Sequence, residues 1–172
     1  TFKFLGFNPR SPLVNMTAMV TSAPAAVHQY AGDGKISMGR VTRELARAGR
    51  DFAKFMTRKG RLDPETQSVL EEFKRKGEDD PQLTRDALAA MQGGVGKTWD
   101  SIMRKAMWMF GITEQWNRGS TLLAAYRVAK DRLVKDGIDE ATAQRQAIEI
   151  AADATVRAHA GYGKANLPEW AQ

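Results

Sequence analysis

Apolar side chains recur at every third or fourth position along most of the chain, which is the spacing of one face of an α-helix. In residues 37–59 the repeated apolar positions are Val41, Leu45, Ala48, Phe52 and Met56. The same period continues through residues 113–136, and no segment shows the strict alternation of a half-buried strand. The pattern therefore predicts an all-α fold.

Residues that start and stop helices lie between these periodic segments. Asp63, Pro64 and Gly77 are examples, because Asp caps a helix start, Pro fits the first turn and Gly favours a helix end. We predict an irregular bundle of about six to seven helices joined by short loops rich in Gly, Asp and Pro. A short helix is expected to start at Ser11, and the others are expected at residues 37–59, 64–76, 81–92, 98–110, 113–136 and 139–158.

The chain divides by composition into three segments. Residues 1–34 are expected to form short helices and a loop, residues 35–77 a basic helix followed by an acid-capped helix, and residues 78–172 a helical bundle with an irregular C-terminal tail. The length of 172 residues suits one domain or two small ones, and the chain starts with Thr rather than Met. We expect the chain to be processed or to form part of a larger protein.

Positive charge is concentrated in one predicted helix. The formal net charge of the chain is +6, and residues 35–61 alone hold nine Lys and Arg against two acidic residues, so the rest of the chain is close to neutral. Seven of these cations recur at spacings of three or four, as one helix face requires: Arg40, Arg43, Arg47, Arg50, Lys54, Arg58 and Arg61.

On a single helix this row would extend over about 30 Å, on the face adjacent to the apolar one. Like charges in a row repel one another unless an anion lies along them, and arginine is the favoured partner of phosphate. We predict that the row contacts the phosphates of double-stranded DNA without reading its sequence. The alternative is a solvated face, or a face paired with acidic residues of a neighbouring subunit.

Residues 92–98, QGGVGKT, look like a phosphate-binding loop. The usual pattern G-x-x-x-x-G-K-[ST] needs glycine where Met91 stands, and the variant that begins with lysine has Gln92 at that position. A helical segment precedes the loop, whereas such loops are delivered by a buried strand. We predict a break between two helices, in which Gly93 and Gly94 end the first helix and Thr98 caps the second.

Side chains that carry catalytic or metal chemistry are sparse. The chain has no cysteine, which excludes disulfides, thiolate metal sites and a cysteine nucleophile. His28 and His159 are far apart and no carboxylate cluster accompanies them, so we predict no catalytic residue, no metal site and no cofactor. Glu114, Asn117 and Arg118 share one helix face, and we expect a structural polar cluster there, either buried or on the helix surface.

Residues 11–32 contain no charged side chain. The segment does contain polar residues and prolines, and the sequence has no run of 18 mainly apolar residues. We expect the segment to be buried within protein, with membrane contact as the alternative.

Three stretches together resemble one family of phage proteins: NPRSPLVNMT (8–17), FGITEQWNRGSTLLAAYR (110–127) and YGKANLPEW (162–170). They are similar to the late portion of the very long tailed-phage proteins of the PLxRFG type, which include internal virion and ejection proteins of short-tailed phages. The matching positions are Asn8, Ser11, Asn15, Phe110, Glu114, Asn117, Arg118, Tyr162, Asn166 and Pro168. The PLxRFG motif itself is absent, and Leu167 stands where the family often has a basic residue.

This resemblance implies a helical piece of a virion component that is packaged in the head near the portal and expelled with the DNA into the host cell envelope. Such proteins form homo-oligomeric rings or tubes that conduct DNA, and their partners are other ejection proteins or the portal, double-stranded DNA and the host envelope. A stand-alone helical nucleic-acid-binding or regulatory domain is the alternative function. A nucleotide-binding protein that uses residues 92–98 is the third.

Overall fold

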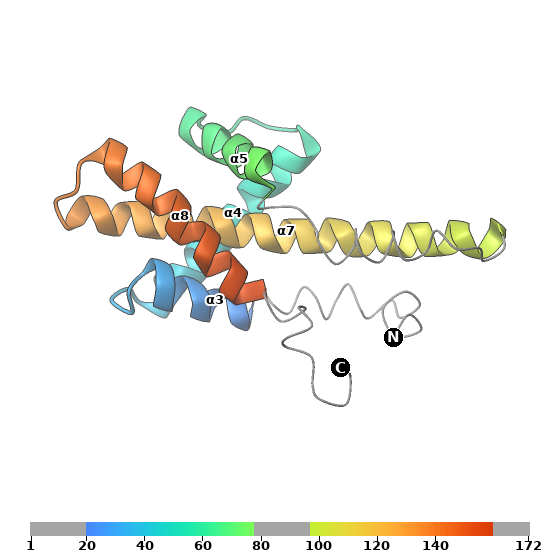
Figure 1. The fold of residues 1–172 in the computed structure, drawn as a ribbon, viewed down its shortest axis with the longest axis horizontal. Coiled ribbons are helices and arrows are strands. Elements are labelled where there is room, and N and C mark those ends of the chain that lie inside the picture. Colours follow the sequence, from blue (N-terminus) through green and yellow to red (C-terminus); the bar gives the residue numbers. More distant parts are fainter. Residues whose placement is uncertain (1–19, 78–96, 160–172) are drawn as a thin grey trace.

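The computed structural model describes residues 20–77 and 97–159, and of residues 97–107 and Phe110 it describes the backbone only. The helices in chain order are α3 (Ser22–Ala26), which continues into the π-helical turn η2 (Val27–Ala31), then α4 (Met38–Thr57), α5 (Pro64–Lys76), α7 (Lys97–Lys135) and α8 (Glu140–His159) (Figure 1). The described residues contain no strand, so the all-α prediction is confirmed. They form five helices, slightly fewer than predicted.

α7 is one continuous helix, whereas the sequence predicted two helices separated at Gly111. Glycine costs about 1 kcal/mol in a helix interior, and packing offsets this cost because Gly111 is buried. Thr98 lies within α7 and is not the cap of a new helix. Four predicted features lie outside the described residues, namely the helix at 11–19, the helix at 81–92, the glycine loop at 92–96 and the tail at 160–172.

α7 follows the long axis of the molecule, and the other helices pack around its C-terminal half (Figure 1). Residues 117–126 are all buried, so about three turns of α7 are covered on every side. α8 folds back along α7 after a short connection, and α3 and η2 pack against α8. The N-terminal half of α7 extends beyond the other described helices (Figure 1).

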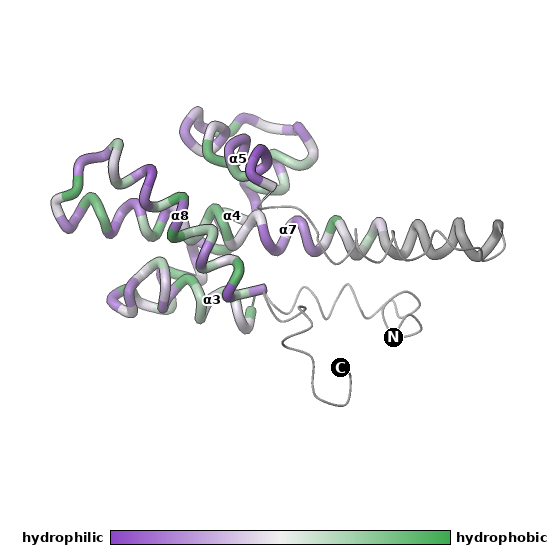
Figure 2. The backbone as a smooth tube through the Cα atoms, viewed as in Figure 1, coloured by the Kyte–Doolittle hydropathy of each residue, from purple (hydrophilic) through white to green (hydrophobic). Residues whose placement is uncertain are grey.

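Small side chains allow α8 to pack closely on its neighbours. Ala143, Ala147, Ala151 and Ala154 are fully buried at spacings of three or four along the helix. Figure 2 shows hydrophilic and hydrophobic segments alternating along α8 as its residues turn toward and away from the core. This alternation is the helical period that the sequence predicted.

Two glycines allow α4 and α7 to cross closely. The Trp116 indole N–H donates to the carbonyl oxygen of Gly49 at 3.0 Å, and a Cβ atom on Gly49 would stand 2.9 Å from Cζ2 of Trp116. On α7, a Cβ atom on Gly119 would overlap the ring of Phe52. Because both contacts need a residue without a side chain, they fix the position of α4 on α7 and thus the direction of its outer face.

Polar contacts hold α5 against α4 and α7. The Arg127 guanidinium donates to Asp51 of α4 at 2.8 Å and to the Thr66 hydroxyl of α5 at 3.0 Å. The Lys130 ammonium donates to Glu65 at 2.7 Å, and this hydrogen bond is the main reason that the pKa of Glu65 is lowered. The start of α5 is therefore linked to both of the helices on which it lies.

The described part of the uncharged N-terminal segment is buried on one side only. Its residues 20–32 contain α3 and η2, in which Ala23, Val27 and Ala31 are fully buried. Within the described ranges, none of the helices has both the length and the apolar character that crossing a membrane requires.

Candidate nucleic-acid interface

The seven predicted phosphate contacts do not all lie on one helix. α4 starts after Ser37, whose hydroxyl accepts a hydrogen bond from the Arg40 amide at 3.3 Å, and it ends at Thr57. Arg58 and Arg61 lie beyond this end, in the connection to α5. The row on α4 is therefore shorter than predicted. We call it the basic face, and it consists of Arg40, Arg43, Arg47, Arg50 and Lys54.

α4 ends earlier than predicted because the chain turns at Arg58 rather than at Gly60. Arg58 has a φ of 54°, in the left-handed region that glycine adopts readily and arginine does not. The Lys59 amide donates to the Lys54 carbonyl at 3.2 Å, which closes the last turn of the helix. Gly60, with a φ of 90°, then supplies the second bend.

The basic face points away from the core. Each of its last four cations lies two residues after a buried residue, and two residues turn a helix by about 200°. The pairs are Val41 with Arg43, Leu45 with Arg47, Ala48 with Arg50, and Phe52 with Lys54. The basic and buried faces are therefore nearly opposite, which corrects the prediction of adjacent faces.

The middle of the basic face is exposed and carries uncompensated positive charge. Arg43, Arg47 and Arg50 are exposed, and no carboxylate of the described ranges forms an ion pair with them. Glu44 is close in sequence, but its side chain is half-buried and forms no ion pair among the described residues. An external anion could therefore approach these three arginines without displacing a protein partner from the described part of the chain.

The two ends of the basic face are fastened to internal carboxylates. Arg40 pairs with Asp131 of α7 at 2.6 Å, and Lys54 pairs with Asp51 at 3.2 Å. Burial would raise the pKa of Asp131, but hydrogen bonds from Lys135 and Arg40 outweigh it and lower this pKa below its usual value. The carboxylate of Asp131 is therefore ionised at neutral pH, and its contact with Arg40 fixes α4 on α7.

The predicted polar cluster is buried. Glu114, Asn117 and Arg118 have exposed fractions of 6%, 0% and 8%. The Thr121 hydroxyl, one turn later, donates to the Asn117 carbonyl at 2.8 Å and lies 3.1 Å from Nε2 of His159 in α8. Since a hydroxyl has one hydrogen to donate, Nε2 of His159 is the donor to Thr121. His159 belongs to this cluster, although the sequence predicted no role for it.

The environment of His159 favours its neutral form. Burial lowers the pKa of His159 to about 4, and the charge of Arg118 adds to this effect. A neutral ring that donates through Nε2 links α8 to α7 and suits a structural contact. Within the described ranges, no group of three or more His, Asp and Glu residues is arranged to hold a metal ion.

A second polar network joins α4, α5 and α7, and the sequence did not reveal it. Besides Asp51, Arg127 and Lys130 it includes Tyr126, whose hydroxyl donates to Glu65 at 2.6 Å. Burial raises the pKa of Tyr126, and the hydrogen bond to Glu65 raises it further. The partners are 61 to 76 residues apart in sequence. The one available signal was that an inward-facing tyrosine needs a partner for its hydroxyl.

Comparison with protein-family models, with curated proteins and with solved structures finds no significant match. The contacts of His159 with Thr121 and of Arg127 with Asp51 link helices to one another, whereas the basic face is directed outward.

Proposed function

We propose that this chain is a structural, non-enzymatic module of a phage ejection protein, and that it contacts DNA phosphates through the basic face of α4. The observation that supports this function is the exposed centre of the face, Arg43, Arg47 and Arg50. The nearby carboxylates Asp131 and Asp51 are engaged in fastening α4. Negative charge for the centre of the face would therefore come from a bound molecule.

The spacing of the arginines suits a phosphate backbone. Arg43 and Arg50 are seven residues apart, which is about 10 Å along the helix axis. Duplex DNA carries one negative charge per about 1.7 Å of its axis, so a duplex aligned with α4 presents about six phosphates over this length. One guanidinium group can donate two parallel hydrogen bonds to phosphate oxygens, and contacts of this kind are independent of base sequence.

The resemblance to ejection proteins supplies the biological setting of the proposal. The module would be packaged inside the capsid near the portal and expelled with the DNA into the host envelope. Copies of the chain would form a ring or tube with the basic face toward the lumen, together with other ejection proteins or the portal.

Exposed apolar side chains on α7 support such an assembly. Trp108 and Met109 have exposed fractions of 66% and 54%, and Ile112 lies one turn further along the same helix, also exposed. Large apolar side chains that are grouped on a surface mark sites of protein contact. These residues precede the enclosed part of α7, where a second copy would have access to them.

DNA binding at several salt concentrations tests the phosphate contact. If three arginines each displace one counterion, the logarithm of the association constant should fall against the logarithm of salt concentration with a slope of about −3. Replacing Arg43, Arg47 and Arg50 together with Gln should remove most of the binding and most of the slope. The matched control carries the same change at three exposed cations of α5 and α8, which are Arg75, Lys76 and Arg145. An equal loss in both triple variants would show that net charge alone matters, and would contradict the proposal.

The oligomeric state separates the virion module from a stand-alone nucleic-acid-binding or regulatory domain. Mass photometry with and without DNA should detect rings or tubes, and Trp108→Asp should weaken their formation because it places a charge in the contact. A chain that stays monomeric while it binds DNA strongly would overturn the assembly and favour the stand-alone domain.

A further inference from the structure

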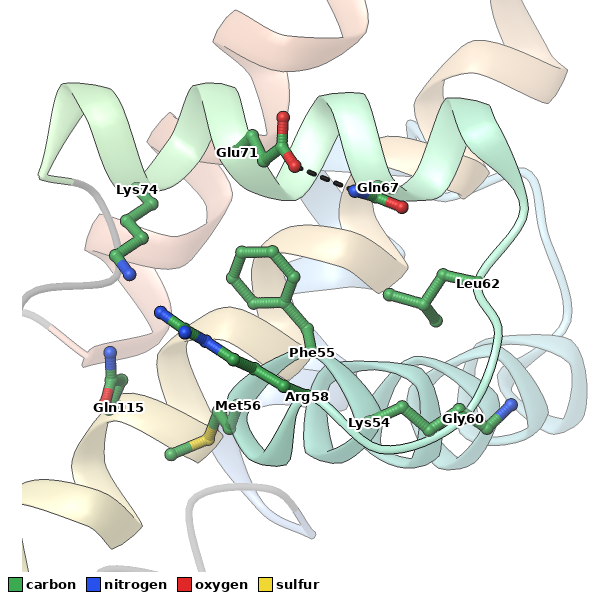
Figure 3. Close-up of a pocket in the computed structure, with 10 residues that line it drawn as sticks. All are labelled: Lys54, Phe55, Met56, Arg58, Gly60, Leu62, Gln67, Glu71, Lys74 and Gln115. Carbon is green, nitrogen blue, oxygen red and sulfur yellow. Dashed lines mark hydrogen bonds between the residues drawn. The ribbon is translucent and has the colours of Figure 1, made fainter.

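A cavity of about 650 Å³ lies between the C-terminal end of α4 and α5 (Figure 3). Its volume is in the range typical of small-molecule sites. Phe55, Met56 and Leu62 form its apolar part, and the side-chain amides of Gln67 and Gln115 also line it. The cavity therefore offers both an apolar surface and groups that donate and accept hydrogen bonds.

Two cations, one from the turn after α4 and one from α5, are directed toward the same end of this cavity. Figure 3 shows the guanidinium of Arg58, which follows α4, and the ammonium of Lys74, from α5, pointing toward the end where Gln115 lies. Neither cation forms an ion pair within the described part of the chain, and the acidic residue of the lining, Glu71, accepts a hydrogen bond from Gln67 at 3.0 Å. Two like charges held toward one space favour an anion between them.

The backbone explains why Arg58 enters the cavity. A continued helix would have kept Arg58 in line with the basic face, since it lies four residues after Lys54. The left-handed conformation at φ 54° ends the helix there instead, and the side chain lies between α4 and α5 (Figure 3). Lys54, the last cation of the basic face, also lines the cavity. The basic face therefore ends at the cavity.

Phe55 supplies a surface on which a planar group can stack. Its half-buried ring stands between α4 and α5 in Figure 3. Bases of single-stranded nucleic acid stack on aromatic side chains of this kind while cations hold the backbone. An acyl chain would need more apolar surface than three side chains provide. A nucleotide unit needs an aromatic ring, a polar edge and a cation for its phosphate, and the lining contains all three.

We propose that this cavity receives one unpaired nucleotide of a strand that lies along the basic face, with its base on Phe55 and its phosphate held by Arg58 and Lys74. The inference rests on the proposed phosphate contact and extends it to DNA with an unpaired strand or end. A base within a duplex is stacked on its neighbours and enters such a cavity only when it leaves the stack.

The affinities of the intact chain for a thymidine oligonucleotide of about 20 residues and for a duplex of the same length test the inference. Phe55→Leu keeps an apolar side chain but removes the aromatic ring, so single-strand affinity should fall about ten-fold. Duplex affinity should change less than about two-fold, because duplex phosphates contact the basic face and not the ring. Tyr30→Leu is the matched control, because it removes an exposed aromatic ring in η2, away from the cavity.

Photo-cross-linking of the wild-type chain provides a measurement that does not depend on the folding of a variant. A single strand containing 5-bromodeoxyuridine should form adducts with the tryptic peptides 55–58, 62–74 or 106–118, which contain residues of the cavity lining. Adducts confined to other peptides would overturn the inference.

The outcomes separate the cavity from the proposed function. If Phe55→Leu leaves single-strand affinity unchanged while the basic-face triple variant loses DNA binding, the cavity proposal fails and the phosphate contact stands. If the triple variant binds as well as wild type while Phe55→Leu loses single-strand affinity, the phosphate contact fails instead. A cavity that binds an acidic aromatic peptide and excludes the oligonucleotide also overturns the inference.

Discussion

The basic face of α4 and the buried cluster around Arg118 contain the same kind of cation in opposite environments. Arg47 is exposed, and in water two unit charges at 4 Å interact by about 1 kcal/mol. Arg118 is 8% exposed, and in a less polar interior the same interaction is several times stronger. The difference indicates that the buried charge contributes to the stability of the fold, whereas the exposed charge of the basic face contributes little to it.

Arg118→Ala is the most severe test of this comparison. We expect the free energy of unfolding to fall by on the order of 4 kcal/mol, because the substitution leaves a void where a large, 8% exposed side chain stands and removes the interactions that this side chain makes. Arg47→Ala is the matched control on the basic face and should change this free energy by less than about 0.5 kcal/mol. Urea denaturation followed by circular dichroism measures both values. Similar losses in the two variants would break the comparison.

The buried histidine makes stability depend on pH. Its pKa falls from 6.5 to about 4 on folding, so between these values the unfolded chain binds a proton that the folded chain does not. The contribution of neutral His159 to the free energy of unfolding is therefore fully present above pH 6.5. It decreases as the pH falls toward 4, by up to about 3 kcal/mol. Thermal unfolding between about pH 7 and pH 4 measures this loss.

His159→Gln should flatten the pH dependence in this window, and His28→Gln should leave it in place. Asp51 and Asp131 also have lowered pKa values, because hydrogen bonds from cations outweigh the effect of burial. The two carboxylates contribute to the free energy of unfolding above their unfolded pKa of about 4, and this contribution is lost at lower pH. The pH range of their effect is therefore separate from that of His159. A stability that is constant from pH 7 to pH 4 would contradict the neutral, buried state of His159.

A buried glycine, Gly119, and an exposed one, Gly39, allow the same comparison of interior and surface without a change of charge. Gly119→Ala should lower the free energy of unfolding by about 2 kcal/mol, because its Cβ atom would overlap Phe52 at the crossing of α4 and α7. Gly39→Ala is the control on the exposed side of α4, where no heavy atom lies within 4 Å of the added Cβ atom. It should raise stability by up to about 1 kcal/mol through helix propensity. A neutral Gly119→Ala would argue against the close crossing.

The positions of most described helices could be predicted because their signals are local. Asp63 caps α5 through the Thr66 amide at 2.8 Å, and Gly77 ends the helix with a φ of 71°, as expected from their residue types. Gly111 was misleading because helix propensity is a weak preference that burial overrides. The turn at Arg58 could not be foreseen, since nothing in its side chain favours the left-handed conformation.

The candidate site could be predicted only in part from the sequence, for a different reason. The spacing of the basic face followed from the helical period, but its direction and its anchors depend on contacts between distant residues. Arg40 and Asp131 are 91 residues apart, and Thr121 and His159 are 38 residues apart. The cavity combines α4, the following turn, α5 and α7, so no single stretch of sequence contains its pattern.

The projecting half of α7 fixes the distance between the start of this helix and its contact with α4. From Lys97 to Gly111 the helix extends for about 20 Å. The contact between Trp116 and Gly49 joins this helix firmly to α4. A partner bound near the start of α7 would therefore be held at a set distance and orientation from the arginines of α4. In an assembly of copies, α7 would act as a spacer that decides how far the charged surface stands from the neighbouring subunit.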